Sequence, residues 1–425
     1  MSSPDVIVVG AGAIGAATAY ELARRGARVT LLERSHVAAG CSYGNAGLIS
    51  PSHTEALANP AALRDGIAWL ARRDSPFHLR PRLSLLPWLA RFGAASLSGR
   101  SAAATATLRA LTAVSLEAHE ALARAGLPTS FARLGILSVY ESEPAFAAAR
   151  TRARDLSDTR VLAPEAARAL EPALGPDIAG AILHEREAHC DPGDFTTALV
   201  EGARALGAEV HTGVETLSLR RCNGRVVELQ TSAGALRPGA IVLAAGAWTK
   251  ALAAQAGVHV ALEGGKGYHL ELAAGEPPPP RLPMFLEEAR VTATPLAGRL
   301  RFTGTLELAG LDQRIDPIRL EAIGRAARRV LALSPQVQPP RIWRGLRPCA
   351  PDGLPIVGRA DGIANLYLAT GHAMLGIALA PVTGEIVADL VTGASPRHDI
   401  ERFAPSRFRR VRQAMTNHVR TGGRS

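Results

Sequence analysis

The chain begins with a pattern of apolar and small residues that is typical of a β-α-β unit. Residues 5–9 form a short apolar run, which predicts a buried strand, and residues 16–25 have the apolar spacing of a helix. Residues 28–32 predict the next strand. The glycines Gly10, Gly12 and Gly15 lie between the first strand and the helix. This order of strand, glycine turn and helix predicts that the segment binds a dinucleotide.

Each glycine of this turn has a distinct physical role. Gly10 allows a tight turn, Gly12 lets the backbone approach a pyrophosphate, and Gly15 lets the helix pack closely on the strand. Glu33 follows eighteen residues after Gly15, near the spacing of about twenty at which an acidic side chain binds ribose hydroxyls. A 2′-phosphate would be repelled there, so we expect an ADP-ribosyl ligand without one. The alternative is a helix that only needs small residues.

The remaining pattern predicts further α/β units and then a strand-rich region. We expect a second β-α-β unit over residues 178–212, whose helix has Asp194 as its N-cap. Residues 60–120 read as helices, and short strands between residues 264 and 306 indicate a separate sheet. Helices are also expected at residues 143–154, 164–170, 318–333 and 377–391, and strands at 133–140, 226–230, 241–243 and 366–368.

The net charge of the chain excludes few classes of binding partner. The 425 residues carry a formal charge of +10, almost entirely from arginine. This basicity could favour an anionic substrate or a membrane surface, although a solvated basic surface is the more ordinary explanation. Basic residues are scattered and no nucleic-acid module is present, which argues against nucleic acid. The arginine-flanked apolar helices of residues 60–92 could contact a membrane interface or, more ordinarily, pack on a neighbouring domain.

The four cysteines indicate neither a disulfide framework nor a metal site. Cys41, Cys190, Cys222 and Cys349 are far apart and form no CxxC or zinc spacing. They suggest a reducing compartment. The first apolar run breaks into the glycine turn, so we interpret it as a core strand and not a signal peptide. We therefore expect a cytoplasmic protein, with peripheral contact to the inner membrane left open.

Five motifs together give the chain a resemblance to the D-amino-acid oxidase/dehydrogenase superfamily of FAD enzymes. It is most similar to bacterial D-amino-acid dehydrogenases of the small-subunit type and to D-hydroxyproline dehydrogenases. The motifs are residues 10–15 with Glu33, residues 41–47, residues 245–248, residues 345–348 continuing through 352–358, and residues 370–372.

The resemblance implies an α/β fold. A Rossmann-type FAD-binding domain (glutathione-reductase-2-like) would be interleaved with a smaller α+β substrate domain built on a mainly antiparallel sheet. The expected FAD-binding segments are residues 1–55, 155–255 and 342–398, and the expected substrate or cap segments are residues 56–154 and 256–341. Residues 399–425 would form a basic C-terminal helix or tail.

The resemblance also implies which residues contact noncovalently bound FAD. Cys349 does not align with the flavin attachment point of relatives that hold FAD covalently. A helix N-terminus at residues 371–376 would stabilise a negatively charged flavin edge. The cofactor-binding residues carried over are Gly10, Gly12, Ala13, Ile14, Gly15, Glu33, Arg34, Ser42, Asn45, Ala46, Gly47, Leu48, Val214, Ala245, Gly246, Trp248, Gly371, His372, Ala373, Met374, Leu375 and Gly376.

For the substrate, the resemblance points to Arg347, Tyr268 and His53. In related enzymes an arginine in Gly-Leu-Arg-Pro holds the substrate carboxylate, and its planar fork suits two oxygens at once. Tyr268 matches a tyrosine that donates to that carboxylate or closes the pocket, although a half-buried strand tyrosine is nearly as good an interpretation. His53, His269, Arg301 and His372 are weaker candidates, for which a structural or flavin-side role is more ordinary.

The implied reaction is oxidative deamination of a D-amino acid, with D-proline and cis-4-hydroxy-D-proline among the candidates. Electrons would pass to a quinone or the respiratory chain. One alternative is a glycine, sarcosine or D-amino-acid oxidase that uses oxygen. Another is an FAD-binding subunit of a heteromeric enzyme that is inactive alone, so both homo- and hetero-oligomers stay open. An NAD-dependent dehydrogenase would leave the later motifs unexplained.

Overall fold

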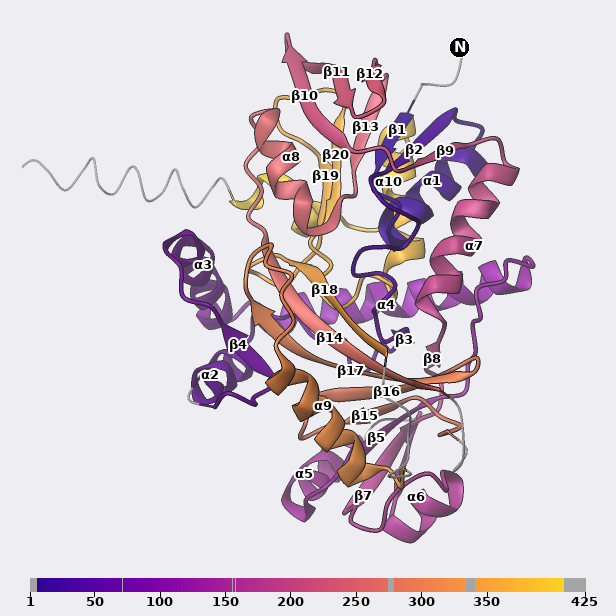
Figure 1. Ribbon diagram of the computed structural model, residues 1–425, viewed down its shortest axis with the longest axis vertical. Coiled ribbons are helices and arrows are strands. Elements are labelled where there is room, and N and C mark those ends of the chain that lie inside the picture. Colours follow the sequence, from indigo (N-terminus) through magenta and orange to yellow (C-terminus); the bar gives the residue numbers. More distant parts are fainter. Residues whose placement is uncertain are drawn as a thin grey trace, which may run out of the picture.

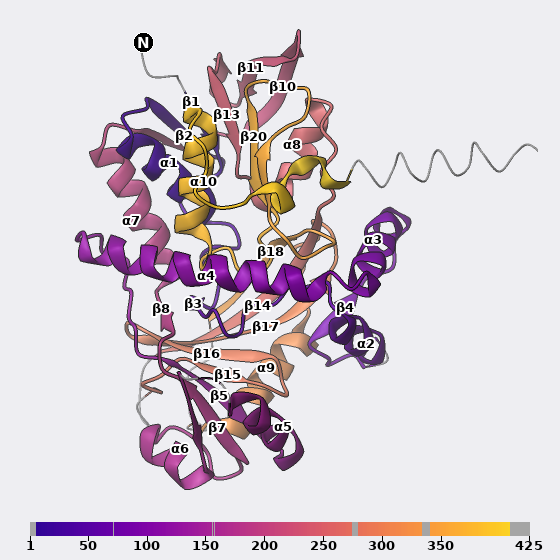
Figure 2. The same ribbon diagram turned by 180° about the vertical axis from the view of Figure 1, so that it is seen from behind.

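The computed structural model describes residues 6–70, 72–154, 156, 158–273, 279–333 and 341–408. Two large sheets lie one above the other in Figure 1, and the long helix α4 (Ser101–Arg124) crosses the molecule where the two lobes meet, as Figure 2 shows from behind. Among the described residues, no helix is long and apolar enough to cross a bilayer.

The upper lobe is built on a six-stranded sheet of the order β19-β20-β13-β1-β2-β9. All of its pairings are parallel except that of β19 with β20. Its central strands are apolar and buried, as expected of a parallel sheet covered on both faces. The strands are β1 (Val6–Val9), β2 (Val29–Glu33), β9 (Glu209–Thr212), β13 (Ala240–Leu243), β19 (Ile356–Arg359) and β20 (Leu366–Thr370).

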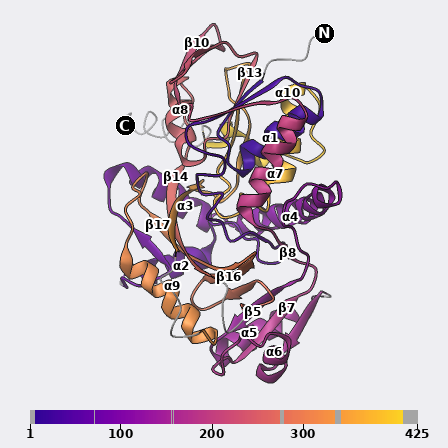
Figure 3. The same cartoon turned by 45° about the vertical axis from the view of Figure 1, so that its right-hand side comes forward.

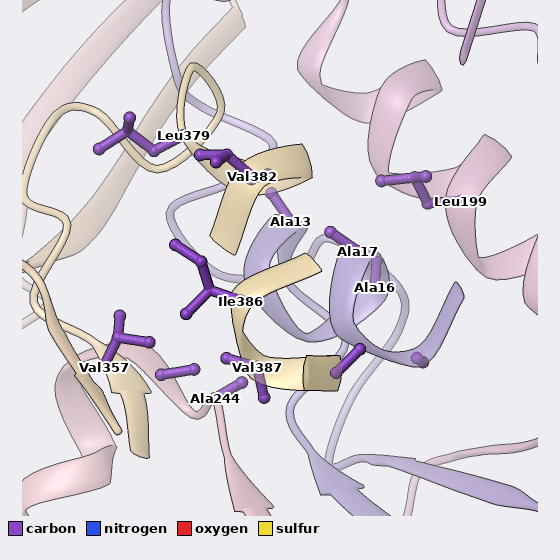
Figure 4. Packing of buried hydrophobic residues seen from close by; sticks show 14 of the residues in the cluster. Ala13, Ala16, Ala17, Leu199, Ala244, Val357, Leu379, Val382, Ile386 and Val387 are labelled. Carbon is purple, nitrogen blue, oxygen red and sulfur yellow. The ribbon is translucent and has the colours of Figure 1, made fainter. Parts of the chain in front are cut away.

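Helices α1 (Ala13–Arg24), α7 (Pro192–Ala205) and α10 (Ala380–Thr392) pack together beside this sheet. Small side chains let α1 and α10 approach closely: a Cβ on Gly384 would lie 2.7 Å from the carbonyl group of Ala17. Figure 4 shows Ala13 of α1 close to Val382 of α10, and Ala16 and Ala17 between α10 and Leu199 of α7. The alanine-rich stretch after the glycine turn thus serves helix packing.

A small sheet and a short helix complete this lobe. Strands β10 (Thr216–Cys222), β11 (Arg225–Thr231) and β12 (Gly234–Leu236) form an antiparallel three-stranded sheet. Helix α8 (Thr249–Gln255) follows the 3-10 turn η2 (Gly246–Trp248) and packs on β10.

The lower lobe is built on a nine-stranded, mainly antiparallel sheet. The order is β18-β14-β17-β16-β15-β5-β7-β6, with β4 paired to β17, and only the β15–β5 and β17–β4 pairs are parallel. Helix α9 (Pro317–Val330) packs on this sheet, as Figure 3 shows, and α5 (Glu143–Ala153) and α6 (Pro164–Leu170) lie at its far end. The strands are β4 (Phe77–Leu79), β5 (Ile136–Tyr140), β6 (Thr159–Leu162), β7 (Gly180–His184), β14 (Glu263–Ala273), β15 (Met284–Leu286), β16 (Val291–Leu296), β17 (Arg299–Leu308) and β18 (Arg341–Cys349).

Two further regions lie outside these large sheets. Strands β3 (Leu48–Ile49) and β8 (Ala188–His189) pair where the chain passes from one lobe to the other. Helix α2 (Pro60–Trp69), the 3-10 turn η1 (Leu83–Leu85) and helix α3 (Leu86–Leu97) project together at one edge of the molecule in Figures 1 and 2. The mixed α/β class and the separate, mainly antiparallel sheet are as predicted.

The predicted second β-α-β unit is wrong. Strand β7 belongs to the nine-stranded sheet, and only α7 and β9 join the six-stranded sheet. The N-cap of α7 is Asp191, whose carboxylate accepts from the backbone N–H of Gly193. Pro192 then occupies the first helical position, where an N–H would have no partner in any case. Asp194 instead accepts a hydrogen bond from the Ser130 hydroxyl.

The sheets also suggest different domain boundaries. Strands β6 and β7 lie in the segment 155–255 that was expected to bind FAD, and β18 lies in the segment 342–398 except for its first residue, but all three belong to the nine-stranded sheet. We propose boundaries near residues 189 and 349 instead. Residues 401–408 form two 3-10 turns, η3 (Glu401–Phe403) and η4 (Pro405–Phe408), and the rest of the expected tail, 409–425, lies outside the described residues.

Candidate functional site

One cavity of about 2050 Å³ extends between the two sheets. Its lining includes the glycine turn at one end and residues of β5, β15 and β18 at the other. Pockets for a single small ligand are typically about 300–1,000 Å³. The volume therefore has room for an extended dinucleotide and a second, smaller molecule.

The glycine turn leaves no room for side chains. Gly10 has a φ of +106°, and a Cβ on Gly15 would lie 1.8 Å from the carbonyl oxygen of Gly10. Gly12 is the N-cap of α1 without a side-chain cap, and the first turn carries no acidic residue. The backbone N–H of Ala13 donates to the hydroxyl of Ser42. The helix N-terminus is thus suited to an anion such as a pyrophosphate.

The strand end that carries Glu33 forms the next part of the cavity wall. The Glu33 carboxylate accepts from the backbone N–H groups of Ala11, at 2.9 Å, and Ser35, at 3.0 Å. The Arg34 guanidinium lies 4.0 Å from the ring centre of Trp248, and the N–H of Val214 donates to the Glu33 carbonyl. A strand end with a fixed carboxylate beside the glycine turn fits an adenosine ribose.

The loop of residues 42–48 is fastened by side chains from the other lobe. The Arg301 guanidinium donates to the carbonyls of Tyr43 and Asn45, both at 2.7 Å, and the Thr294 hydroxyl donates to the carbonyl of Ala46. The Asn45 amide in turn donates to the carbonyl of Met374. The two loops predicted to flank the flavin are therefore joined to each other and to the nine-stranded sheet.

The loop of residues 371–376 is attached to the strand that carries Arg347. The N–H of Ala373 donates to the carbonyl of Pro348, and Cys349 forms a β-bridge with His372. The His372 ring hydrogen-bonds to Thr383, and burial lowers the pKa of His372 to about 3, so that ring is neutral. The loop expected to contact the flavin is therefore hydrogen-bonded to the strand that carries Arg347, the arginine expected to bind the substrate.

Arg347 lines the cavity without a carboxylate partner. Among the described residues no Asp or Glu oxygen lies within 4.0 Å of its guanidinium, whose Nη1 donates instead to the carbonyl of Thr305. Burial lowers the pKa of Arg347 from its usual value, but a guanidinium remains charged at neutral pH. Thr305 has a φ of +66°, an uncommon backbone conformation that clusters at functional sites. This partly buried cation is available to an anionic ligand.

Two residues beside Arg347 were not predicted from the sequence. A Cβ on Gly267 would lie 2.3 Å from the guanidinium, so this glycine gives the arginine its place across β14. The Trp343 ring covers Gly44 and Gly345 and stacks on His269 with ring centres 5.0 Å apart. The glycine-rich stretch 264–267 could be recognised in the sequence as a place where another group approaches the backbone. The strand register that brings Gly265 opposite Arg347 could not.

The predicted substrate contact of Tyr268 is wrong. Successive residues of a strand face opposite sides, and because Gly267 faces the cavity, Tyr268 faces away from it. Its ring is fully buried and its hydroxyl donates to Glu307 at 2.8 Å. Lys266 pairs with the same carboxylate at 3.2 Å. Tyr268 therefore belongs to a buried charged cluster under α9.

His53 lies in the cavity wall, but both of its ring nitrogens are engaged. Nε2 lies 2.7 Å from the Ser138 hydroxyl and 3.2 Å from Glu287, and Nδ1 lies 3.0 Å from the Ser50 hydroxyl. Although burial opposes the charge, Glu187 and Glu287 raise the pKa of His53 to about 9. Ligand atoms of His53, His184 and Glu187 lie within 4.8 Å of one another, close enough for a cation. Ion pairs and hydrogen bonds already account for this cluster.

The structure brings most of the predicted cofactor-binding residues into one cavity wall. Gly15, Gly47 and Gly371 do not line it but shape its loops, and the weaker candidates His269 and Arg301 are buried beside it. The residues that line the cavity are Gly10, Gly12, Ala13, Ile14, Glu33, Arg34, Ser42, Asn45, Ala46, Leu48, Val214, Ala245, Gly246, Trp248, His372, Ala373, Met374, Leu375 and Gly376, together with Arg347 and His53.

Comparisons with known proteins agree with this geometry. Residues 5–390 match the family described as FAD dependent oxidoreductase. The chain is 34% identical over 416 residues to a D-amino acid dehydrogenase of Paramagnetospirillum magneticum, covering 95% of this chain and 98% of the relative. It is 33% identical over 419 residues to the D-amino acid dehydrogenase of a Methylobacterium species, covering 96% and 99%.

Solved structures share the fold. Glycine oxidase from Geobacillus kaustophilus aligns with a TM-score of 0.74 and 25% identity over 96% of this chain and 99% of the other. L-proline dehydrogenase from P. horikoshii gives a TM-score of 0.74 at 20% identity, over 96% and 98%. The match to the family model spans most of the chain and both lobes, and the chain therefore belongs to the family of FAD-dependent oxidoreductases.

Proposed function

We propose that the chain oxidises a D-amino acid at its α carbon and passes the electrons to a quinone. The observation that carries this proposal is Arg347, a partly buried guanidinium in the cavity wall without a carboxylate partner among the described residues. A cation in that position is matched by the carboxylate that every amino acid carries. The two curated relatives named above, each about one third identical over nearly the whole chain, are D-amino acid dehydrogenases.

The residues that line the cavity support a position for each part of FAD. We propose that the N-terminus of α1 holds the pyrophosphate, Glu33 the ribose, and the loops 42–48 and 371–376 the flavin ring. FAD, when bound, supplies the two-electron acceptor for the hydride that leaves the substrate α carbon. Burial raises the pKa of Cys41 and raises that of Cys349 to about 12, which disfavours the thiolate form and supports noncovalent binding of FAD.

The protein's own contribution is orientation. Arg347 meets both carboxylate oxygens and fixes the α carbon, because its planar fork leaves little freedom of rotation. Its position is set by Gly267 and by the Thr305 carbonyl. The amine must lose its ammonium proton before transfer, since the neutral nitrogen pushes electrons into the forming imine. No strong general base is needed, which agrees with His53 being engaged by Glu287 and Ser138.

The experiment is anaerobic bleaching of the flavin absorbance. The purified, FAD-loaded chain is mixed with a panel of D- and L-amino acids that includes D-proline and both hydroxyproline epimers. We expect bleaching by D-amino acids and not by their L enantiomers. Bleaching only by L enantiomers would overturn the stereochemistry, and none by any amino acid would overturn the substrate class or show that a partner subunit is required.

The likeness to glycine oxidase supports one alternative acceptor, oxygen. Hydrogen peroxide is measured against reduction of an artificial dye during turnover of the same substrate. Peroxide in near-stoichiometric amounts would replace the quinone assignment with an oxidase. Little peroxide together with fast dye reduction supports the dehydrogenase.

A further inference from the structure

Three residues of β17 lie on the cavity side of the nine-stranded sheet. Gly304 faces the opposite side, because a Cβ on it would lie 3.1 Å from the Ile323 side chain of α9. Successive residues of a strand face opposite sides, so Thr303 faces the cavity, and both Thr303 and Thr305 line it. Arg301, two positions before Thr303, contacts a loop of the other lobe. Thr303 therefore lies between Arg301 and Thr305 on this face of the strand.

The two neighbours of Thr303 on this face hold the two groups that surround the expected substrate. Arg301 holds the loop of residues 42–48, which is expected to contact the flavin. The Thr305 carbonyl accepts from Arg347, which is proposed to bind the substrate carboxylate. Hydride transfer requires the α carbon to be held between the flavin ring and the group that binds this carboxylate. Thr303 therefore lies beside the expected position of the α carbon and its amine.

The Thr303 hydroxyl has no hydrogen-bond partner among the described residues. The residue is only 7% exposed, although it lines the cavity. Burying a hydroxyl without a partner is unfavourable, and most buried polar groups in folded proteins are paired. Rotation about χ1 exchanges the hydroxyl with the methyl group, so the oxygen can turn towards a molecule in the cavity. An unpaired hydroxyl in this position is suited to a partner that the ligand supplies.

Unpaired polar atoms recur at other places where this cavity is expected to hold a ligand. Among the described residues that line the cavity, three have a buried side-chain nitrogen or oxygen without a partner: Thr216, Thr303 and His372. Thr216 lies two residues after Val214, at the end of the cavity expected to bind the nucleotide. His372 belongs to the loop expected to contact the flavin. Thr303 has the corresponding place at the end expected to bind the substrate.

Thr292 of β16 provides a matched comparison for Thr303. The two threonines are directly opposite each other in the sheet, and both line the cavity. The Thr292 hydroxyl is already engaged, because it donates to the carbonyl of Thr303 at 3.4 Å. The same residue type on the same face of the sheet therefore differs in one respect, which is whether its hydroxyl is free for a ligand.

We propose that the Thr303 hydroxyl oxygen accepts a hydrogen bond from the α-amine of the substrate and so orients the α carbon together with Arg347. The inference rests on the proposed function, because it needs an amino acid whose carboxylate binds Arg347. The hydride takes the electron pair of the Cα–H bond to FAD, and the nitrogen lone pair forms the second bond of the imine. A contact through N–H leaves that lone pair free. Positive charge develops on the nitrogen during this step, which strengthens the hydrogen bond to the Thr303 oxygen.

The amine contact is tested by binding without turnover. The FAD-loaded protein is titrated calorimetrically with 2-aminoisobutyrate, an amino acid that has no α hydrogen and cannot be oxidised, and with 2,2-dimethylpropanoate, in which a methyl group replaces the amine. We expect Thr303→Val to weaken binding of 2-aminoisobutyrate roughly tenfold and to leave binding of 2,2-dimethylpropanoate at the parental level. Thr303→Ser, which keeps a hydroxyl, and the control Thr292→Val should bind both probes as the parent does. An equal loss for both probes, or no loss for either, would overturn the contact.

The orienting role is tested by anaerobic flavin reduction with the best substrate at saturating concentration. We expect Thr303→Val to lower the limiting rate at least tenfold, Thr303→Ser to stay within roughly threefold of the parent, and Thr292→Val to be parental. The melting temperature of Thr303→Val should stay the same or rise, because an unpaired buried hydroxyl is replaced by a methyl group. A parental limiting rate in Thr303→Val would overturn the orienting role. A lower melting temperature with loss of FAD would assign the hydroxyl to the fold instead.

The two experiments separate this inference from the proposed function. A parent that is bleached by D-amino acids while Thr303→Val behaves identically would overturn the role of Thr303 and leave the proposed function in place. A parent that binds 2-aminoisobutyrate but is bleached by no amino acid would overturn the proposed function, while the pair of probes still judges the amine contact. No binding of 2-aminoisobutyrate by the parent would overturn the contact itself.

Discussion

Two arginines on the nine-stranded sheet have opposite surroundings. Arg301 of β17 is fully buried, donates to Glu271 through two nitrogens and holds the carbonyls of Tyr43 and Asn45. Arg347 of β18 is also inside the molecule, yet it has no carboxylate partner among the described residues and lies in the cavity wall. Every donor of Arg301 serves the fold, whereas most donors of Arg347 are left for a ligand.

The comparison distinguishes an arginine that stabilises the fold from an arginine that is available to bind a ligand. A buried charge that lacks a partner is unfavourable unless something binds to it, so it is retained where binding matters. A buried charge that is paired instead holds the neighbouring chain segments in position. Arg301 holds the 42–48 loop from the far lobe, and Arg347 faces the space that this loop encloses. The predictions below test this difference.

The largest expected effect is that of Arg301→Met on stability. Removing one partner of a buried ion pair costs roughly 3–5 kcal/mol, and the carbonyls of Tyr43 and Asn45 lose their donor as well. We expect a strong fall in melting temperature and loss of FAD during gel filtration. Arg341→Met, an exposed change on β18, is the control. A melting temperature equal to that of the parent would remove the distinction between the two arginines.

Arg347→Ala should affect activity and not folding. Loss of a preorganised charge contact lowers the rate of flavin reduction by roughly 10²–10³-fold, about 3–4 kcal/mol. The melting temperature should stay the same or rise, because a partly buried charge without a carboxylate partner is removed. Stopped-flow reduction and thermal unfolding are measured on the same preparation. A variant that unfolds early but reduces its flavin at the parental rate would reverse the roles assigned to the two arginines.

Gly267→Ala tests whether the position of Arg347 matters, because this substitution should displace the guanidinium without removing it. A Cβ at this position would lie 2.3 Å from the guanidinium, and a displacement of about 1 Å can cost up to 10²-fold in rate. We expect kcat/KM to fall roughly 10- to 100-fold while the bound flavin spectrum stays normal. Gly93→Ala should be neutral, because a Cβ there meets nothing within 4 Å. Parental kinetics for Gly267→Ala would mean that the position of Arg347 is unimportant.

His53 shares one feature with each arginine: it is paired with carboxylates like Arg301, and it lines the cavity like Arg347. Its substitution therefore tests whether pairing or position in the cavity determines the role of a cationic side chain. Its pKa is raised from 6.5 to about 9 beside Glu187 and Glu287. A raised pKa stabilises the folded state fully below pH 6.5, and this stabilisation disappears as the pH rises through about 9. At ~1.4 kcal/mol per pKa unit, the loss of stability is about 3–4 kcal/mol.

The measurement is thermal unfolding between pH 6 and pH 10. The parent should lose stability more steeply than His53→Gln, which lacks the titrating ring. Flavin reduction in His53→Gln should stay within a few-fold of the parent at pH 7. Parallel pH profiles would show that the ring is not protonated in the folded protein, and a large loss of flavin reduction would return His53 to the catalytic residues.

The local sequence pattern was sufficient to predict the part of the site that is expected to bind the nucleotide. The strand, glycine turn, helix and acid of residues 5–33 are consecutive, so their spatial relation follows from their sequence spacing. Cys349 and His372 are also close in the fold, but the loops around them were placed only through the resemblance.

The other lobe was harder to predict, because its contacts depend on strand register. Strand β14 is buried on both faces, so it lacks the alternation of polar and apolar residues that would reveal which way Tyr268 points. Arg301 and Glu271 meet across paired strands, and β4 is a three-residue strand within a region that reads as helical. The helix start at Asp191 was missed because Asp194, three residues later, offers a similar cap.

The most direct test of the central claim compares an amino acid with the amine that lacks its carboxylate. Anaerobic flavin reduction is measured for the best substrate and for its decarboxylated counterpart, in the parent and in Arg347→Ala. The parent should prefer the amino acid by at least 10²-fold, and this preference should fall towards one in the variant, since only the carboxylate contact has been removed. A preference that is equally large in both proteins would show that Arg347 does not hold the substrate carboxylate.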